Sequence, residues 1–141
     1  MNSETGSPPN SMTYKVIPSA KFTRNLKALK KQYKSKRAAQ SLITCIGDIV
    51  EALTSQPQLD GSRLEPWPNI NYPDWEFRKL IFPVPERSGA SGEGRLMYLV
   101  NQQRLLILLV WLYTHEDFKK RPPEKDLKTL MRELLDDTEN S

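Results

Sequence analysis

Five polar side chains in this sequence could together act on a phosphodiester: Arg78, Lys79, Arg95, Tyr113 and His115. They lie in or beside three otherwise apolar segments, so that neighbouring strands would bring them to one end of a sheet. Cleavage of RNA requires deprotonation of the ribose 2′-hydroxyl, stabilisation of the phosphorane charge and protonation of the leaving 5′-oxygen. Arginine binds phosphate through two N–H groups, lysine supplies a point charge or a base, and tyrosine or histidine moves protons. The set is therefore a candidate RNA-cleaving site.

Each of these residues also has a purely structural interpretation. Arg78 and Arg95 could be cross-strand ion-pair partners of Glu76 or Glu93. The histidine could be a surface loop residue, and the tyrosine a core residue whose hydroxyl lies at the rim. The sequence alone leaves both interpretations open.

Other kinds of catalytic site have no support in the sequence. One cysteine and one histidine cannot make an internal disulfide or a Cys/His zinc site, and Cys45 is expected to be a small core residue. There is no Walker loop, GxGxxG, GxSxG, HExxH or EF-hand motif. The Gly/Ser loop at residues 88–94 precedes a strand, so no helix dipole would support phosphate there. We expect neither a metal nor a small-molecule cofactor.

Charge is concentrated in one segment. Residues 21–37 contain eight lysines and arginines and no acidic residue, although the net charge of the whole chain is only +4. Such a segment attracts a polyanion, with nucleic acid the first candidate and an anionic membrane the second. The alternative is a solvated helix face. The candidate RNA-binding residues are Lys27, Lys30, Lys31 and Lys34.

Composition predicts one soluble globular domain with one modest core. The chain has 141 residues, 38% hydrophobic and 27% charged, and a mean hydropathy of −0.61. The N-terminus is polar and lacks the features of a signal peptide, so we expect a cytoplasmic protein without a membrane partner. We expect a disordered leader at residues 1–12, a single domain at 13–137 and a flexible tail at 138–141.

The first half of the chain predicts a strand followed by two helices. Residues 13–17 are β-rich and stop at Pro18, and Ser19 can cap a helix with its apolar stripe at Phe22, Leu26, Leu29 and Tyr33. A second helix is expected at residues 37–55. The proline-rich residues 56–74 are predicted to be a loop, and loops of this length are often functional.

The second half predicts an antiparallel sheet and a last helix. Strands are expected at residues 75–82, 95–100 and 105–113, the last of them buried on both faces. The short link at 101–103 makes two of them a hairpin. Pro122 and Pro123 open the final helix. The prediction is an α+β fold of order β-α-α-β-β-β-α, with two N-terminal helices packed on a small antiparallel sheet.

Several short motifs resemble a known family. They are Trp75-Glu-Phe-Arg-Lys-Leu, the SGASGEG loop at residues 88–94 leading into RLMYLV, and the WLY at 111–113 followed by Lys119, Lys120 and a proline-initiated helix. This order resembles the RelE/HigB branch of the RelE/ParE toxin superfamily over residues 13–135. The resemblance implies a type II toxin that cuts mRNA on the ribosome and thereby inhibits translation, an mRNA interferase. It also implies a cognate antitoxin as partner, besides mRNA and the ribosome.

The resemblance assigns roles to four of the candidate residues. Arg78 and Lys79 match basic residues that bind the scissile region in the family. Arg95 matches its phosphate-stabilising arginine, and Tyr113 matches the aromatic residue of its last strand.

The chain departs from the family pattern at three places. His115 stands where the pattern has a lysine, which leaves open the identity of the acid and the base. Glu93 stands where the pattern has a glycine and puts an acidic side chain near the phosphate site. The proline-rich stretch at residues 57–73 is longer than expected.

Two alternatives to RNA cleavage stay open at this point. The chain could be a ParE-like protein that inhibits DNA gyrase. It could also be a toxin-fold subunit without activity that acts with its antitoxin as a DNA-binding repressor.

Overall fold

The computed structural model describes residues 13–140, so the predicted leader at 1–12 lies outside the described residues. The four predicted strands and the second predicted helix begin and end within two residues of the predicted ranges. In chain order they are β1 (Lys15–Pro18), α1 (Ala20–Lys31), α2 (Lys36–Leu53), β2 (Ser62–Leu64), β3 (Glu76–Pro83), the 3-10 turn η1 (Gly89–Gly92), β4 (Glu93–Asn101), β5 (Leu106–Thr114) and α3 (Glu124–Glu139).

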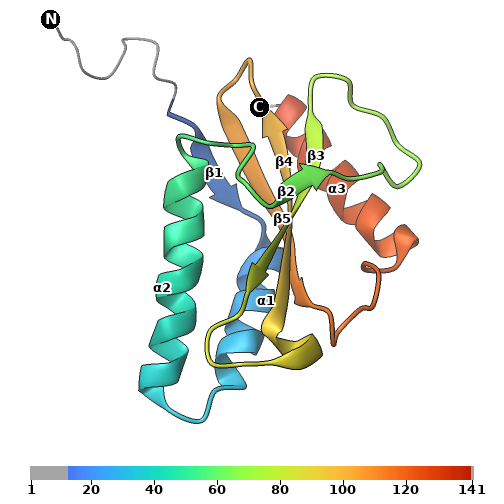
Figure 1. Cartoon of the computed structure of the whole chain (residues 1–141). Helices are drawn as coiled ribbons and strands as arrows, with labels where there is room; N and C mark the ends of the chain where they lie inside the picture. Colours follow the sequence, from blue (N-terminus) through green and yellow to red (C-terminus); the bar gives the residue numbers. More distant parts are fainter. Residues whose placement is uncertain (1–12, 141) are drawn as a thin grey trace, which may run out of the picture.

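The five strands form one sheet in the order β1-β5-β4-β3-β2 (Figure 1). β2 to β5 are antiparallel neighbours, as predicted for the meander, and the α+β class is confirmed. Two details differ from the prediction. β1 pairs with β5 in parallel, so the sheet is mixed. The stretch predicted as a loop contains β2, a three-residue strand too short to show an apolar alternation.

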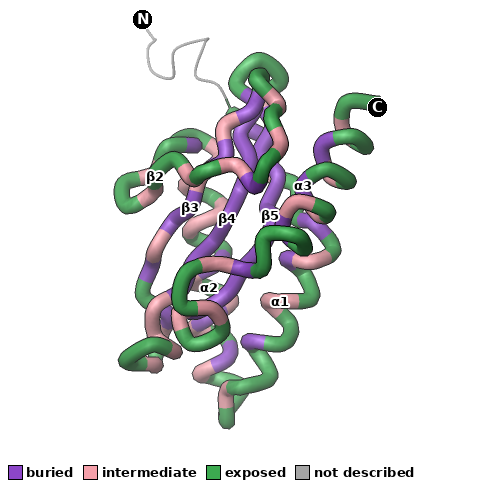
Figure 2. The backbone as a smooth tube through the Cα atoms, turned by 90° about the vertical axis from the view of Figure 1, so that its right-hand side faces the viewer, coloured by how far each residue is buried: buried purple, intermediate pink, exposed green. Residues whose placement is uncertain are grey.

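Helices cover both faces of the sheet. α1 and α2 lie on one side and α3 on the other (Figure 1). The sheet therefore separates two apolar clusters, where the composition predicted a single core. The first includes Leu42, Leu53 and Tyr98, and the second includes Phe77 and Met131. Figure 2 shows the buried positions running along β3, β4 and β5.

Local signals explain the two N-terminal helices. The Ser19 hydroxyl accepts a hydrogen bond from the Phe22 N–H at 3.0 Å, which confirms the predicted cap, and Ser35 caps α2 in the same way. The Ser19 hydroxyl also donates to the Val110 carbonyl at 3.0 Å and so ties α1 to β5. Within residues 13–140, no helix combines the length and the apolar character that crossing a bilayer requires.

α3 is fixed at its C-terminal end. The Tyr72 hydroxyl donates to Asp136 at 2.7 Å, and the Trp75 indole donates to Glu139 at 3.0 Å. α3 continues to Glu139, so the tail predicted for residues 138–141 begins within this helix. These contacts hold the loop before β3 against the C-terminal end of α3.

Candidate functional site

Strand register brings three of the candidate residues to the α3 face of the sheet. Arg95 lies opposite Tyr113 in the β4–β5 pair, and Lys79 lies opposite Met97 in the β3–β4 pair. Met97 and Tyr113 belong to the apolar cluster beneath α3, so this face also carries Lys79 and Arg95. His115 follows directly after β5 and contacts Arg95. Four of the five candidate residues therefore lie together.

Arg78 lies on the opposite face. Adjacent residues of a strand point to opposite sides of the sheet, and Arg78 faces the α2 side, opposite Tyr98. Its guanidinium donates to the Ser62 hydroxyl at 3.1 and 3.2 Å and pairs with Glu76 at 3.4 Å. The expectation that Arg78 acts beside Lys79 is therefore wrong in geometry. Its structural interpretation, an ion pair with Glu76, is the one observed, along one strand instead of across two.

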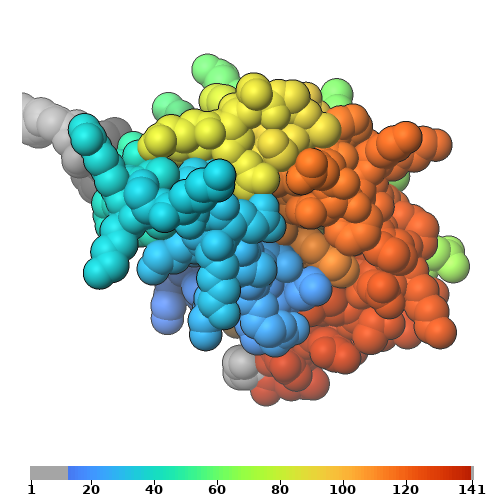
Figure 3. Space-filling view, turned by 90° about the horizontal axis from the view of Figure 1, so that it is seen from below, coloured from blue at the N-terminus to red at the C-terminus, as the bar shows by residue number. Residues whose placement is uncertain are grey.

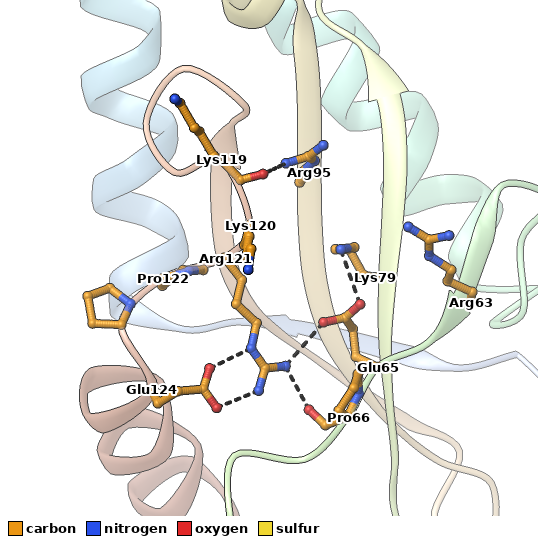
Figure 4. A pocket seen from close by; sticks show the side chains of 11 residues that line it. Arg63, Glu65, Pro66, Lys79, Arg95, Lys119, Lys120, Arg121, Pro122 and Glu124 are labelled. Atoms are coloured by element: carbon orange, nitrogen blue, oxygen red, sulfur yellow. Dashed lines mark hydrogen bonds and ion pairs between the residues drawn. The ribbon is translucent and has the colours of Figure 1, made fainter.

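An open pocket of about 720 Å³ lies between the α3 face of β3 and β4, the 119–123 segment and the start of α3 (Figure 4). Its lining has six basic side chains and two carboxylates. The basic ones are Arg63, Lys79, Arg95, Lys119, Lys120 and Arg121, and the carboxylates are Glu65 and Glu124. This excess of positive charge suits an anionic ligand with several phosphates. Among residues 13–140, no three histidine, cysteine, aspartate or glutamate side chains gather as metal donors.

Glu65 is a residue of the candidate site that no pattern in the sequence indicated. Its side chain is only 8% exposed, and its two oxygens lie 3.1 Å from Lys79 Nζ and 3.2 Å from Arg121 Nη1. Its backbone N–H donates to the Phe77 carbonyl and so continues the pairing of β2 with β3 by one residue. Glu65 thus holds Lys79 at the pocket wall. No local pattern marks it, because it lies between Leu64 and Pro66 in a stretch without periodicity.

Arg121 joins the two sides of the pocket. It binds both oxygens of Glu124 at 2.6 Å and donates to the Pro66 carbonyl at 2.7 Å, besides its contact with Glu65 (Figure 4). The hydrogen bonds with Glu124 raise the pKa of Arg121, and those with Arg121 lower the pKa of Glu124. The spacing of Arg121 and Glu124, three residues apart at a helix start, is the one signal in the sequence that could have indicated this pair.

Arg95 has a partner at each terminal nitrogen. Nη1 lies 2.8 Å from His115 Nδ1 and donates to the Lys119 carbonyl at 3.1 Å, while Nη2 pairs with the Glu93 carboxylate. A guanidinium only donates, so His115 Nδ1 must accept and the proton of the neutral ring lies on Nε2. Arg95 Nε is buried without a partner. Arg95 therefore forms an ion pair with Glu93 along one strand, where a pair across two strands was considered, and it also lines the pocket with Lys79.

Tyr113 belongs to the apolar cluster beneath α3, and its hydroxyl lies at the edge of this cluster. Its ring packs edge-on against Phe118 at 5.7 Å, and its hydroxyl donates to the Lys120 carbonyl at 3.3 Å. Burial raises the pKa of Tyr113 to about 12. The phenol is therefore protonated at neutral pH and is unsuited to accept a proton.

We expect Tyr113→Phe to cleave RNA within about threefold of the wild-type rate and to lose about 1 kcal/mol of stability, since it loses one weak hydrogen bond.

The stability of Tyr113→Phe should also depend less on pH than the stability of the wild type at alkaline pH. The pKa rises from 10 in the unfolded chain to about 12, so wild-type stability falls as pH rises through this range. Urea unfolding should therefore show that the free energy of unfolding of Tyr113→Phe falls less over this pH range than that of the wild type. A large loss of cleavage in a folded variant would instead assign proton transfer to the phenol.

The four candidate RNA-binding lysines lie apart from the pocket. Lys27, Lys30, Lys31 and Lys34 are exposed on α1 and just after it, and none of them lines the pocket. Seen from below, α1 and the start of α2 form one continuous face with the loops 83–92 and 115–121 (Figure 3). α1 and the segment that carries Lys119 thus lie on one face of the molecule.

No protein-family model and no curated protein matches the chain. Two solved structures resemble it. One is the archaeal RelE–RelB complex from Pyrococcus horikoshii OT3, with 18% identity over 73% of this chain and 96% of that chain, and a TM-score of 0.43. The other is the E. coli toxin RelE in the free state, with two arginines mutated to alanine; it has 16% identity over 77% of this chain and 90% of that chain, and a TM-score of 0.44. Both are structures of RelE.

Proposed function

We propose that this chain is the toxin of a type II toxin-antitoxin system and acts as a ribosome-dependent mRNA endonuclease. The observation that supports this proposal best is the pocket whose six basic side chains include Lys79 and Arg95, together with the contact of Arg95 with His115 beside it. Phosphate recognition and a group able to move protons are thereby combined in one place. The resemblance of the sequence motifs to the RelE/HigB branch implies an antitoxin, and we propose an antitoxin partner here.

In the proposed reaction the ribose 2′-oxygen attacks phosphorus and the bond from phosphorus to the 5′-oxygen breaks. A base takes the proton of the 2′-hydroxyl, and the leaving 5′-oxygen receives a proton. The products are therefore a 2′,3′-cyclic phosphate and a 5′-hydroxyl. Arg95 and Lys79 would bind the non-bridging oxygens and stabilise the added negative charge. His115 would move protons, since imidazole suits this task near neutral pH.

Induced expression in cells tests the proposal. An endonuclease produces new 5′ ends in translated transcripts, which primer extension on a reporter mRNA detects. A gyrase inhibitor leaves the mRNA intact and causes a DNA-damage response. A subunit without activity leaves growth unchanged and binds its antitoxin. Either of the last two results would replace the proposal.

The lysines of α1 are proposed to bind ribosomal RNA. In the test variant, Lys30, Lys31 and Lys34 are replaced by glutamine. Binding to purified ribosomes should weaken, and the slope of log affinity against log salt should fall by about 2, since each lost phosphate contact changes it by about 0.7.

A matched control removes the same charge from β1 and α3, at Lys15, Lys125 and Lys128. It should leave the slope within about 0.5 of the wild-type value, because these lysines would make no phosphate contacts. Equal slopes for the two variants would show that only net charge matters and that α1 is a solvated face.

A further inference from the structure

The guanidinium that the proposed reaction needs is already bound to a carboxylate of the same strand. Glu93 and Arg95 are two residues apart on β4, so their side chains project from the same face. The Arg95 side chain is 11% exposed, whereas the Glu93 side chain is 44% exposed. The arginine is therefore held in place by its surroundings, while the glutamate reaches it from the solvent side.

A carboxylate and a phosphate compete for the same donors. Both offer two oxygens in the fork geometry that a guanidinium binds. Of the five N–H groups of Arg95, one on Nη2 is bonded to Glu93 and the two on Nη1 to His115 and the Lys119 carbonyl, which leaves one on Nη2 and the one on Nε. Nε is buried without a partner. A phosphate that binds Arg95 through two N–H groups must therefore displace at least one of these acceptors, and Glu93 is the exposed and charged one.

The structure offers Glu93 a place to move into. Glu93 does not line the cationic pocket. It lines a separate hollow of about 360 Å³ on its other side, together with Ile81, Pro83, Ser88 and Gly92. Its carboxylate could turn into this hollow or into solvent without moving β4, because the Glu93 carbonyl stays bonded to the His115 N–H at 2.9 Å.

We infer that Glu93 is a built-in competitor for the phosphate site, which occupies Arg95 in the free protein and leaves it when an RNA phosphate binds. The inference rests on the proposed function in taking an RNA phosphate as the ligand. Its consequence is that the free protein binds RNA more weakly than its cationic lining alone would allow. Only RNA that the rest of the surface also binds, such as mRNA on the ribosome, would be held firmly enough to displace the carboxylate.

The test compares the affinities of wild type and Glu93→Gln for an all-2′-O-methyl RNA hexamer, which cannot be cleaved because it has no free 2′-hydroxyl. Glutamine keeps the shape of the side chain and removes its charge. We expect Glu93→Gln to bind the hexamer about fivefold more tightly, because a change in affinity of this size corresponds to the strength of a partly exposed ion pair. Glu116→Gln is the matched control, since Glu116 is exposed and lies 4.0 Å from Arg87 instead of Arg95. It should bind within about twofold of wild type. Equal tightening in both variants would overturn the inference.

A second pair of proteins tests the route of the effect. In an Arg95→Ala background, Glu93→Gln should have no more effect than Glu116→Gln has in the same background, because the competition needs the guanidinium. If the fivefold gain persists without Arg95, Glu93 acts through general charge and the inference is wrong.

A measurement without RNA separates this inference from the proposed function. His115 is the single histidine of the chain, so the NMR signals of its ring report on the Arg95 contact directly. Inorganic sulfate should shift these signals at a lower concentration in Glu93→Gln than in wild type. That result would keep the inference even for a protein that cuts no mRNA. If the His115 signals reach half of their shift at the same sulfate concentration in both proteins, the inference is wrong even for an active endonuclease.

Discussion

Arg95→Ala should lower the rate of RNA cleavage by about 100-fold to 1,000-fold, the effect of removing one group that stabilises a transition-state charge. The cause would be the loss of the only arginine that contacts His115 in the described structure. The measurement is cleavage of a reporter mRNA in a translation reaction, with growth arrest on induction as its counterpart in cells. Circular dichroism of the purified variant would show that the fold is retained.

Arg78→Ala is the matched control for this prediction. Both residues are arginines of central strands with a carboxylate partner, but Arg78 lies on the α2 face, with Ser62 and Glu76. Its cleavage rate should stay within about threefold of wild type, because a group on the other face cannot reach the phosphate. Equal losses in two folded variants would mean that RNA does not bind on the α3 face.

Glu65→Gln should destabilise the protein by about 3 kcal/mol, because it leaves Lys79 and Arg121 without their shared buried carboxylate. The side chains of these three residues are 8%, 10% and 16% exposed, so water screens the contacts weakly. Urea unfolding at pH 7 would measure the loss. Lys79 would also lose its anchor, so cleavage by the folded fraction should fall as well.

Glu124→Gln is the control for charge removal in the same network. Glu124 also pairs with Arg121, but its side chain is 62% exposed, so its loss should cost no more than about 1 kcal/mol. A cost as large as that of Glu65→Gln would contradict the account in which burial makes Glu65 the central member of the network.

Features set by neighbouring residues could be predicted from the sequence. The apolar stripe from Phe22 to Tyr33 and the capping hydroxyl of Ser19 are local, and the helix begins where they indicate. The parallel pairing of β1 was missed, because Lys15 lies opposite Leu106, far along the chain, and nothing near either residue indicates the other. β2 was missed because three residues are too few for a pattern.

The candidate site, too, could be predicted from the sequence only where neighbouring residues determine it. Alternation along a strand already separates Arg78 from Lys79, but the apolar run at residues 80–82 hides which of the two faces carries the pocket. That choice depends on α3, whose position is a matter of tertiary packing. Glu65 joins the site through contacts with residues 14 and 56 positions away, and such contacts leave no trace in a single sequence.

The chemistry of the cut ends tests the central claim most directly. RNA fragments made by the wild-type protein on translating ribosomes are collected and their ends are identified by mass spectrometry. Attack by the 2′-hydroxyl in the pocket lined by Arg95 and Lys79, with His115 beside Arg95, predicts a 2′,3′-cyclic phosphate, or the phosphate formed when it hydrolyses, and a 5′-hydroxyl on the other fragment. A 3′-hydroxyl with a 5′-phosphate would mean that water attacked instead and would contradict the account.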